Sequence, residues 1–293
     1  EEHPDMQTAL HIADFIRSHA GRKPFAAWAS IGAPHPPILV PEPFYSMFDP
    51  ASFEAPPGFG ETGEDLPRNV TEDAPGYQAV RGWTREQWAR AMAGYYGYAA
   101  FADHCLDVVM EALRETGALE RTLVVATGDH GEMLGAHNLY QKGVLYDRAC
   151  RLAAVFSGPG VAPGARPQLM SHVDLMPTIL DVFGIEAPAG VQGTSLREIL
   201  RTPQTAGPAV HFVEFNGYIQ GGIHTRAAVS EHWKYIWSEG DSELLFHLSD
   251  DPEECCNRAG DPTCRDVLEA HREALQTWCE RTGDFCQPCE QTC

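Results

Sequence analysis

The sequence predicts an α/β fold in which a sheet with flanking helices is followed by a small antiparallel sheet and a cysteine-rich tail. Short continuous apolar runs alternate with segments of helical periodicity over residues 1–200, which is typical of buried strands and covering helices. The apolar runs of residues 201–254 are shorter and alternate with polar residues, as in antiparallel strands. Seven of the nine cysteines lie in residues 255–293. We therefore expect three regions with these boundaries.

The first segments predict a helix, a strand and a long loop. Apolar residues with helical spacing predict a helix over residues 8–17, and the apolar run 25–31 predicts a strand buried on both faces. That strand leads into a loop in which three prolines surround His35. Residues 41–80 are rich in Pro, Gly and acidic residues without periodicity, and they predict a surface excursion of the type that often covers a site.

The following elements alternate between helix and strand and then become a sheet. A helical pattern extends to Thr116, with Gly117 as its C-cap, and Asp174 is positioned to cap a later helix that ends at Gly184. In open α/β sheets, ligands bind outside the carboxyl ends of the strands, so the polar loop after residue 127 is a candidate site. The ranges predicted are helices at 84–116 and 174–183, and strands at 122–127, 152–156, 211–215, 225–229 and 233–237.

The charge balance excludes one class of partner. The chain has 21 Lys and Arg against 41 Asp and Glu, a formal charge of −20, so it lacks the basic field of a general nucleic-acid binder. Hydrophobic residues make up 43% of the sequence, which indicates a folded domain with a sizeable core. No run is apolar and long enough to predict a membrane segment or a signal peptide.

The cysteines of the tail predict covalent or metal cross-links. Because the tail has few apolar residues, we favour disulfides as a substitute for a core. A zinc site built from Cys279, Cys286, Cys289 and Cys293 is the alternative, although only one C-x2-C knuckle is present. Disulfides would indicate an oxidising compartment, and a periplasmic or secreted protein would fit.

Polar residues at the ends of predicted strands are the candidate functional groups. Asp129 and His130 directly follow a buried strand and lie between two glycines, so both side chains can point into one small volume. Such a pair is half of a metal site, or alternatively a polar turn. His137 and Lys142 follow in the same loop, and His35 ends another predicted strand. Taken singly, a loop lysine is usually a surface residue and either histidine can be a packing residue.

The loop and several later segments resemble the sulfatase family of the alkaline phosphatase superfamily. The resemblance covers nearly the whole chain up to about residue 260. It implies an alkaline-phosphatase-like sheet, of which residues 1–200 would be the latter part of the catalytic domain. The segments that carry it are Gly128-Asp129-His130-Gly131-Glu132-Met133-Leu134-Gly135-Ala136-His137, Gln141-Lys142-Gly143, Leu145-Tyr146-Asp147, Arg151, Pro34-His35-Pro36, Ser157-Gly158-Pro159-Gly160, Ser171-His172-Val173-Asp174, Val191-Gln192-Gly193-Thr194 and Trp233-Lys234-Tyr235.

The resemblance implies a role for each candidate residue. Asp129 and His130 would be ligands of one divalent metal, and His35 and Lys142 would contact the sulfate ester and its leaving oxygen. His137 would be a further substrate-binding residue. A metal and an ammonium neutralise the anionic group, and an imidazole can protonate the departing alkoxide. Calcium is the usual metal of the family, but many members have Asn where His130 stands, and imidazole suits manganese or zinc better.

Two features of the family are absent from this sequence. No Cys or Ser begins the motif Cys/Ser-x-Pro-x-Arg, whose first residue becomes the formylglycine nucleophile. The adjacent aspartates that complete the metal site in the family are also missing, because the sole pair, Asp250-Asp251, falls in the predicted closing sheet. By comparison with the family, we expect this chain to be the latter part of a sulfatase, with formylglycine outside it, and to be inactive alone.

These inferences predict metal-dependent hydrolysis of sulfate esters, in the manner of an arylsulfatase, on a small-molecule or glycan substrate. Two alternatives remain open at this point. The His130 variant also occurs in phosphonate and phosphate monoester hydrolases of the same superfamily. A non-catalytic relative that keeps the anion-binding half of the site would act as a binding module.

Overall fold

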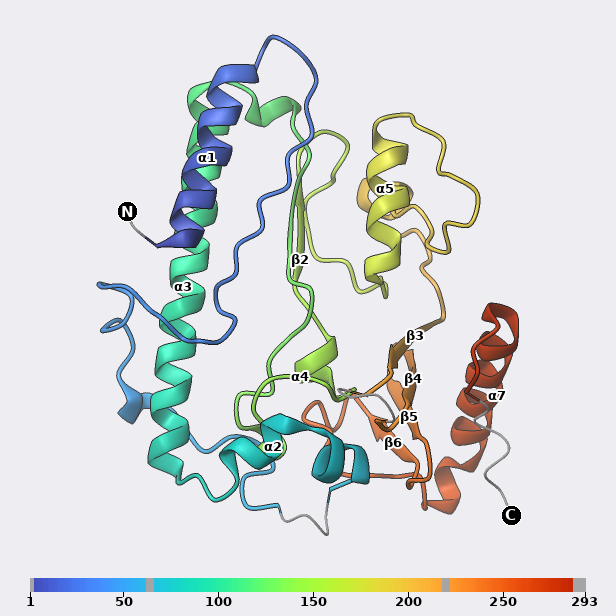
Figure 1. The fold of residues 1–293 in the computed structure, drawn as a ribbon. Helices are drawn as coiled ribbons and strands as arrows, with labels where there is room; N and C mark the ends of the chain where they lie inside the picture. Colours follow the sequence, from blue (N-terminus) through green and yellow to red (C-terminus); the bar gives the residue numbers. More distant parts are fainter. Residues whose placement is uncertain (1–2, 62–65, 218–221, 287–293) are drawn as a thin grey trace. The chain divides into compact units, whose positions relative to one another are not determined.

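The computed structural model describes residues 3–61, 66–217 and 222–286, and it divides into two compact units (Figure 1). The first unit comprises Glu1–Ala55, Gly82–Ala126 and Val155–Pro159, and the second comprises Pro56–Arg81, Thr127–Ala154 and Gly160–Cys293. The helices are α1 (Pro4–His19), α2 (Pro75–Val80), α3 (Arg85–Glu115), α4 (Asp147–Cys150), α5 (Leu175–Val182), α6 (Arg197–Arg201) and α7 (Arg265–Thr282). The strands are β1 (Val124–Thr127), β2 (Ala154–Ser157), β3 (Val210–Phe215), β4 (Thr225–Ser230), β5 (Trp233–Ser238) and β6 (Leu244–His247).

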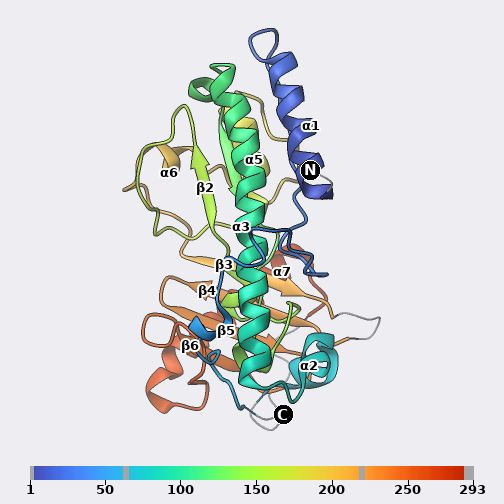
Figure 2. The same ribbon diagram turned by 90° about the vertical axis from the view of Figure 1, so that its left-hand side faces the viewer.

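Two long helices, α1 and α3, lie side by side in the first unit (Figures 1 and 2). Both were predicted, and α3 begins with a capping box in which Thr84 and Gln87 satisfy each other's backbone N–H groups. Ala13 and Ile16 of α1 pack against α3 in an apolar cluster that is almost inaccessible to solvent. The burial of this seam is the main stabilising term between the helices.

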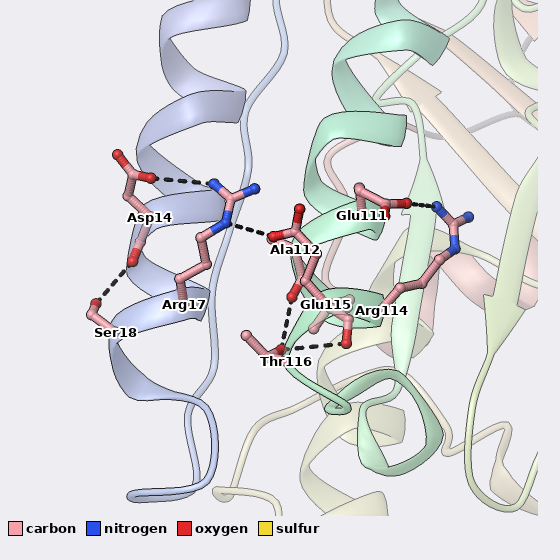
Figure 3. Close-up of polar contacts among 9 residues, drawn as sticks. Asp14, Arg17, Ser18, Glu111, Ala112, Arg114, Glu115 and Thr116 are labelled. Atoms are coloured by element: carbon pink, nitrogen blue, oxygen red, sulfur yellow. Dashed lines mark hydrogen bonds and ion pairs between the residues drawn. The ribbon is translucent and has the colours of Figure 1, made fainter.

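Polar contacts flank the apolar seam. Arg17 Nε of α1 lies 2.8 Å from a carboxylate oxygen of Glu115 on α3, and Arg17 also contacts Asp14 of its own helix (Figure 3). The side chains of Arg17 and Glu115 are 40% and 46% exposed. Solvent screens ion pairs of this kind, so the pair contributes little to stability compared with the apolar seam.

The predicted strand at residues 25–31 is wrong, whereas those at 122–127 and 152–156 are confirmed as β1 and β2, which pair with each other. Residues 25–31 have no regular secondary structure, and the side chain of Trp28 is 81% exposed. A strand requires a neighbour for its backbone N–H and C=O groups. No strand in the described ranges pairs with this segment.

The predicted surface excursion is correct only in its first part. Residues 41–58 have little regular structure, but a π-helix (Asn69–Asp73) and α2 follow within the same segment. Val70 and Tyr77 are buried in the main core of the second unit, together with Leu139 and Tyr146. These two elements are too short to produce a periodic sequence signal, which is why the sequence did not indicate them.

An antiparallel sheet of order β3-β4-β5-β6 organises the second unit, as the alternating runs predicted. Ala228 of β4 is opposite Tyr235 of β5, which is opposite Leu245 of β6, and these three side chains face one core. Their sequence neighbours Ala227, Ile236 and Phe246 face the other core. Both faces of the sheet are therefore buried.

The described part of the tail packs on one of these cores through apolar contacts. Leu268, Leu275 and Cys279 of α7 join the cluster formed by β4, β5 and β6. The prediction of disulfides has no support in the structure, because every cysteine in the described ranges is a free thiol. Cys289 and Cys293, which the zinc alternative requires, lie outside the described residues. The apolar face of α7 supplies the core that the composition of the tail seemed to lack.

None of the described helices is both long and apolar enough to span a bilayer.

A buried ammonium connects the sheet to two loops of the second unit. Lys234 of β5 is 1% exposed, and its Nζ forms ion pairs with Asp147 and with Glu254, the latter at 2.9 Å. Nζ also donates to the carbonyl oxygen of Leu145 at 3.1 Å. Burial alone would lower the pKa of Lys234, but the two carboxylates raise it overall, so the side chain is charged.

We expect Lys234→Met to lower the free energy of unfolding by about 3–5 kcal/mol, because two carboxylates would be left buried without their cation. Urea denaturation followed by circular dichroism measures this loss. Arg68→Met is the matched control: Arg68 pairs with Glu72, but both side chains are more than half exposed, so we expect a much smaller loss of stability. Equal effects of the two substitutions would contradict the role given to Lys234.

Candidate active site

Asp129 and His130 follow β1 and present a carboxylate and an imidazole to each other. Asp129 Oδ1 accepts the backbone N–H of His130 at 3.0 Å, and Oδ2 lies 3.7 Å from His130 Nε2. His130 Nδ1 lies 2.9 Å from the carbonyl oxygen of Gly131, so Nδ1 carries a proton and donates it. Nε2 is then the ring nitrogen that faces the carboxylate, in the orientation of a metal-ligating histidine.

The geometry of this pair fits a shared cation. Two ligand atoms at bond lengths of about 2.0–2.6 Å can lie up to about 4–5 Å apart, and the 3.7 Å separation falls within this limit. The Asp129 side chain is 89% exposed and that of His130 is 33% exposed, so an ion has access from solvent. The mixed oxygen and nitrogen donors suit manganese or zinc, while the distance alone also admits calcium.

Gly131 fixes the position of the pair. Its N–H donates to the carbonyl oxygen of Ala149 at 2.8 Å. A Cβ atom at this position would lie 2.0 Å from the carbonyl oxygen of Arg148, far inside van der Waals contact. Only glycine permits this approach, which joins the Asp129–His130 segment to α4.

Glu132 shapes the loop that carries Lys142. Its carboxylate accepts the backbone N–H of Leu134 at 3.1 Å and that of Gln141. Burial raises the pKa of Glu132, although both hydrogen bonds and the ammonium of Lys142 act in the opposite direction. The side chain thus brings the two ends of residues 132–141 together, and the ammonium of Lys142 is near enough to act electrostatically on it. Sequence reasoning included Glu132 in the motif without giving it this role.

His172 is a second residue whose contact with the site was missed. Its Nε2 donates to the carbonyl oxygen of Gly128 at 2.8 Å, immediately before Asp129. The buried carboxylate of Asp174 accepts the N–H groups of Ser171 and Thr194 at 2.9 and 2.8 Å, which orders the turn that bears His172. Asp174 is the N-cap residue of α5, as predicted, but its side chain accepts no N–H of that helix. The only sequence signal for His172 was its position in a segment of the family resemblance.

His35 belongs to the first unit, whereas the other candidates belong to the second. The buried carboxylate of Asp5 accepts the N–H groups of Gly32 and Ala33, both at 2.8 Å. His35 N donates to Gly32 O at 2.8 Å, and His35 Nδ1 donates to Pro36 O at 2.6 Å. These bonds give the exposed imidazole a fixed tautomer on a fixed loop.

His137 lies in the second unit among protein groups. It is 3% exposed, and its ring stacks on Tyr146 with centroids 4.3 Å apart. Nδ1 lies 2.9 Å from Glu61 Oε2, and Nε2 lies 3.0 Å from the carbonyl oxygen of Glu253. Both nitrogens therefore contact protein groups, and the substrate contact expected of His137 stays a prediction.

Comparison with solved structures identifies the class of fold. The structure is similar to a phosphonate monoester hydrolase of Agrobacterium radiobacter, with a TM-score of 0.80 and 27% identity over 97% of this chain and 62% of that one. The neighbours have an alkaline-phosphatase-like fold, and this chain shares it.

Sequence comparison identifies the family. The profile of the sulfatase family matches residues 1–185, and that described as N-sulphoglucosamine sulphohydrolase, C-terminal, matches residues 135–281. The chain belongs to the sulfatase family. It is 27% identical to an arylsulfatase of Clostridium perfringens, over 93% of this chain and 57% of that protein. It is 30% identical to a delta 4,5-hexuronate-2-O-sulfatase of Bacteroides thetaiotaomicron, over 69% of this chain and 44% of that protein. The chain thus spans about half the length of the curated relatives that it matches.

We expect Gly131→Ala to destabilise the protein by about 2 kcal/mol or more, since the new methyl group would collide with backbone. Thermal unfolding and metal titration are the measurements, and metal affinity falls with stability if the segment shifts. Gly260→Ala is the control, because a Cβ atom there meets no atom within 4 Å. Unchanged stability in Gly131→Ala would show that the segment is free to move.

Proposed function

We propose that this chain supplies part of the metal and substrate site of a hydrolase that acts on sulfate esters. The observation that carries the proposal is the Asp129–His130 pair, whose ligand atoms lie 3.7 Å apart at the end of β1. Membership of the sulfatase family, which generally depends on a divalent metal, supports the same chemistry. Because the formylglycine motif is absent from this sequence, the nucleophile is proposed to come from outside it.

Four side chains have the proposed roles. Asp129 and His130 hold the divalent ion, which when bound neutralises the anionic ester and polarises its oxygens. The ammonium of Lys142 binds the sulfate oxygens, and the fixed loop of Glu132 limits its movement. The imidazole of His35 donates a proton to the leaving oxygen as the ester bond breaks. Sulfated small molecules or glycans are the proposed substrates, in line with the names of the relatives.

We expect Asp129→Ala to abolish metal binding at the Asp129–His130 pair and aryl sulfate hydrolysis together, and Lys142→Ala to retain that metal while slowing turnover about 100-fold or more. The test uses a protein that contains this whole sequence together with the formylglycine nucleophile. Metal content and kcat are measured on each variant. Lys23→Ala is the control, because Lys23 is an exposed lysine of the first unit. Full activity of Lys142→Ala would remove that residue from the site. An Asp129→Ala variant that binds as many equivalents of metal as the parent would refute the ligand assignment.

Hydrolysis of phosphonate monoesters is the second candidate function. His130 and the likeness to phosphonate monoester hydrolases at TM-scores of 0.80 and 0.77 favour it. We expect kcat/KM for an aryl sulfate to exceed that for the matching aryl phosphonate by about tenfold or more. Parallel assays with the same leaving group measure the ratio. The reverse ratio would replace the sulfate assignment, and the absence of both activities would favour a binding module.

A further inference from the structure

A second group of metal-ligating side chains lies in the second unit, and it includes neither Asp129 nor His130. Glu61, His137 and Cys255 each direct one donor atom to a common point, and the three donor atoms all lie within 4.8 Å of one another. An ion with bonds of about 2.0–2.3 Å can reach all three after small side-chain rotations. The group combines oxygen, nitrogen and sulfur donors, a combination that favours zinc over calcium or magnesium.

The hydrogen bonds of His137 orient it as a ligand. Nε2 lies 3.0 Å from the carbonyl oxygen of Glu253, which can only accept, so Nε2 carries the proton. Nδ1 lies 2.9 Å from Glu61 Oε2, and this carboxylate favours a proton on Nδ1, which a bound metal ion would replace. A proton or a cation must lie between these two atoms, because a lone pair and a carboxylate repel each other. Backbone carbonyls commonly fix metal-bound histidines in this way.

The backbone around the three donors is held by hydrogen bonds. His137 N donates to Pro57 O at 2.9 Å, and Asn138 Nδ2 donates to Glu61 O at 2.7 Å. Asp251 accepts the N–H groups of Cys255 and Cys256 at 3.0 and 2.8 Å. A site whose backbone is already ordered loses little conformational entropy when an ion binds.

The local charge favours a cation. The carboxylates of Glu61, Asp251 and Glu253 act electrostatically on the Cys255 thiol. The same negative potential that opposes the free thiolate attracts a divalent ion, and the ion would in turn favour the thiolate.

We propose that Glu61, His137 and Cys255 bind one zinc ion, with water completing its coordination. The ion joins the loop of Glu61, the active-site loop five residues before Lys142, and the segment after β6. The ion therefore cross-links the loop that carries Lys142 to the other two segments. Three protein ligands and one open position make the ion exchangeable.

The test is a Co²⁺ and Zn²⁺ titration of reduced protein that contains this whole sequence. Cys255→Ser is compared with Cys256→Ser. Both cysteines are exposed and adjacent, but only Cys255 belongs to the proposed zinc site, so Cys256→Ser is the control. We expect Cys256→Ser to bind one more equivalent of metal ion than Cys255→Ser. With Co²⁺, the extra equivalent produces a cobalt–thiolate charge-transfer band that Cys255→Ser lacks. Metal bound by cysteines of the tail is common to both variants and cancels.

Two further variants separate this site from the proposed active site. When Asp129→Ala is added to each cysteine variant, we expect the difference of one equivalent of metal between them to persist. Failure of the proposed function would therefore leave this result intact. Glu61→Gln keeps a hydrogen-bonding group beside His137 but loses the anionic ligand, and we expect its zinc affinity to fall about tenfold or more. Zinc raises the Tm of Cys256→Ser by several degrees more than that of Cys255→Ser. Equal stoichiometry in the two cysteine variants, or no binding at micromolar zinc, would overturn the proposal.

Discussion

The ammonium of Lys234, buried between two carboxylates, connects the sheet of the second unit to the loops around the candidate active site. It binds Asp147 and Glu254, which lie far apart in the sequence, and it also binds Leu145 O. The backbone N–H of Asp147 donates to Glu254 as well, so the two segments contact each other directly. A buried charge tolerates little displacement, because each lost contact leaves an uncompensated group in a medium of low polarity. Residues 145–149 therefore form a fixed surface, and Gly131 is hydrogen-bonded to it through Ala149 O.

The loop between Glu132 and Lys142 depends on this support because its backbone is strained. Four residues other than glycine have positive φ within this loop, a conformation that costs each of them about 1 kcal/mol or more. Hydrogen bonds to Glu132, stacking of His137 on Tyr146 and burial of Leu139 offset that cost. A strained loop held by a rigid surround is typical of functional sites. The four residues are Leu134, His137, Asn138 and Gln141, with φ values of 43°, 52°, 56° and 71°.

The sequence predicted those elements whose signals are local. The strand before Asp129 is a β-branched run, and α3 has a cap at each end, so both could be located from neighbouring residues alone. The apolar run 25–31 has an equally clear pattern, but a strand also needs a partner, and no pattern within the run shows whether one exists. The prediction of disulfides in the tail lacks support for another reason. The cysteines suggested cross-links, but Leu268, Leu275 and Cys279, which have helical spacing, pack α7 on the sheet.

The candidate site was predicted in part for the same reason. Asp129 and His130 are neighbours in sequence, so their proximity required no knowledge of the fold. Glu132 and His172 act through backbone groups that are brought close only by folding, and a sequence pattern does not record such contacts. Glu61 approaches His137 across 76 residues, and its place beside that ring follows from hydrogen bonds between two loops.

Net charge places a final constraint on the site. A chain of charge −20 repels an anionic ester at long range, so attraction must come from groups close to the substrate. The carboxylates near the candidate site are largely compensated within the protein. Glu132 accepts two backbone N–H groups, Asp147 and Glu254 share Lys234, and Glu253 forms a two-point pair with Arg148 at 2.7 and 3.0 Å. Asp129, by contrast, is 89% exposed and has His130 beside it. The internal pairing of its neighbours leaves Asp129 as an accessible carboxylate for a cation, and a bound cation would reverse the sign of the local field that the substrate meets.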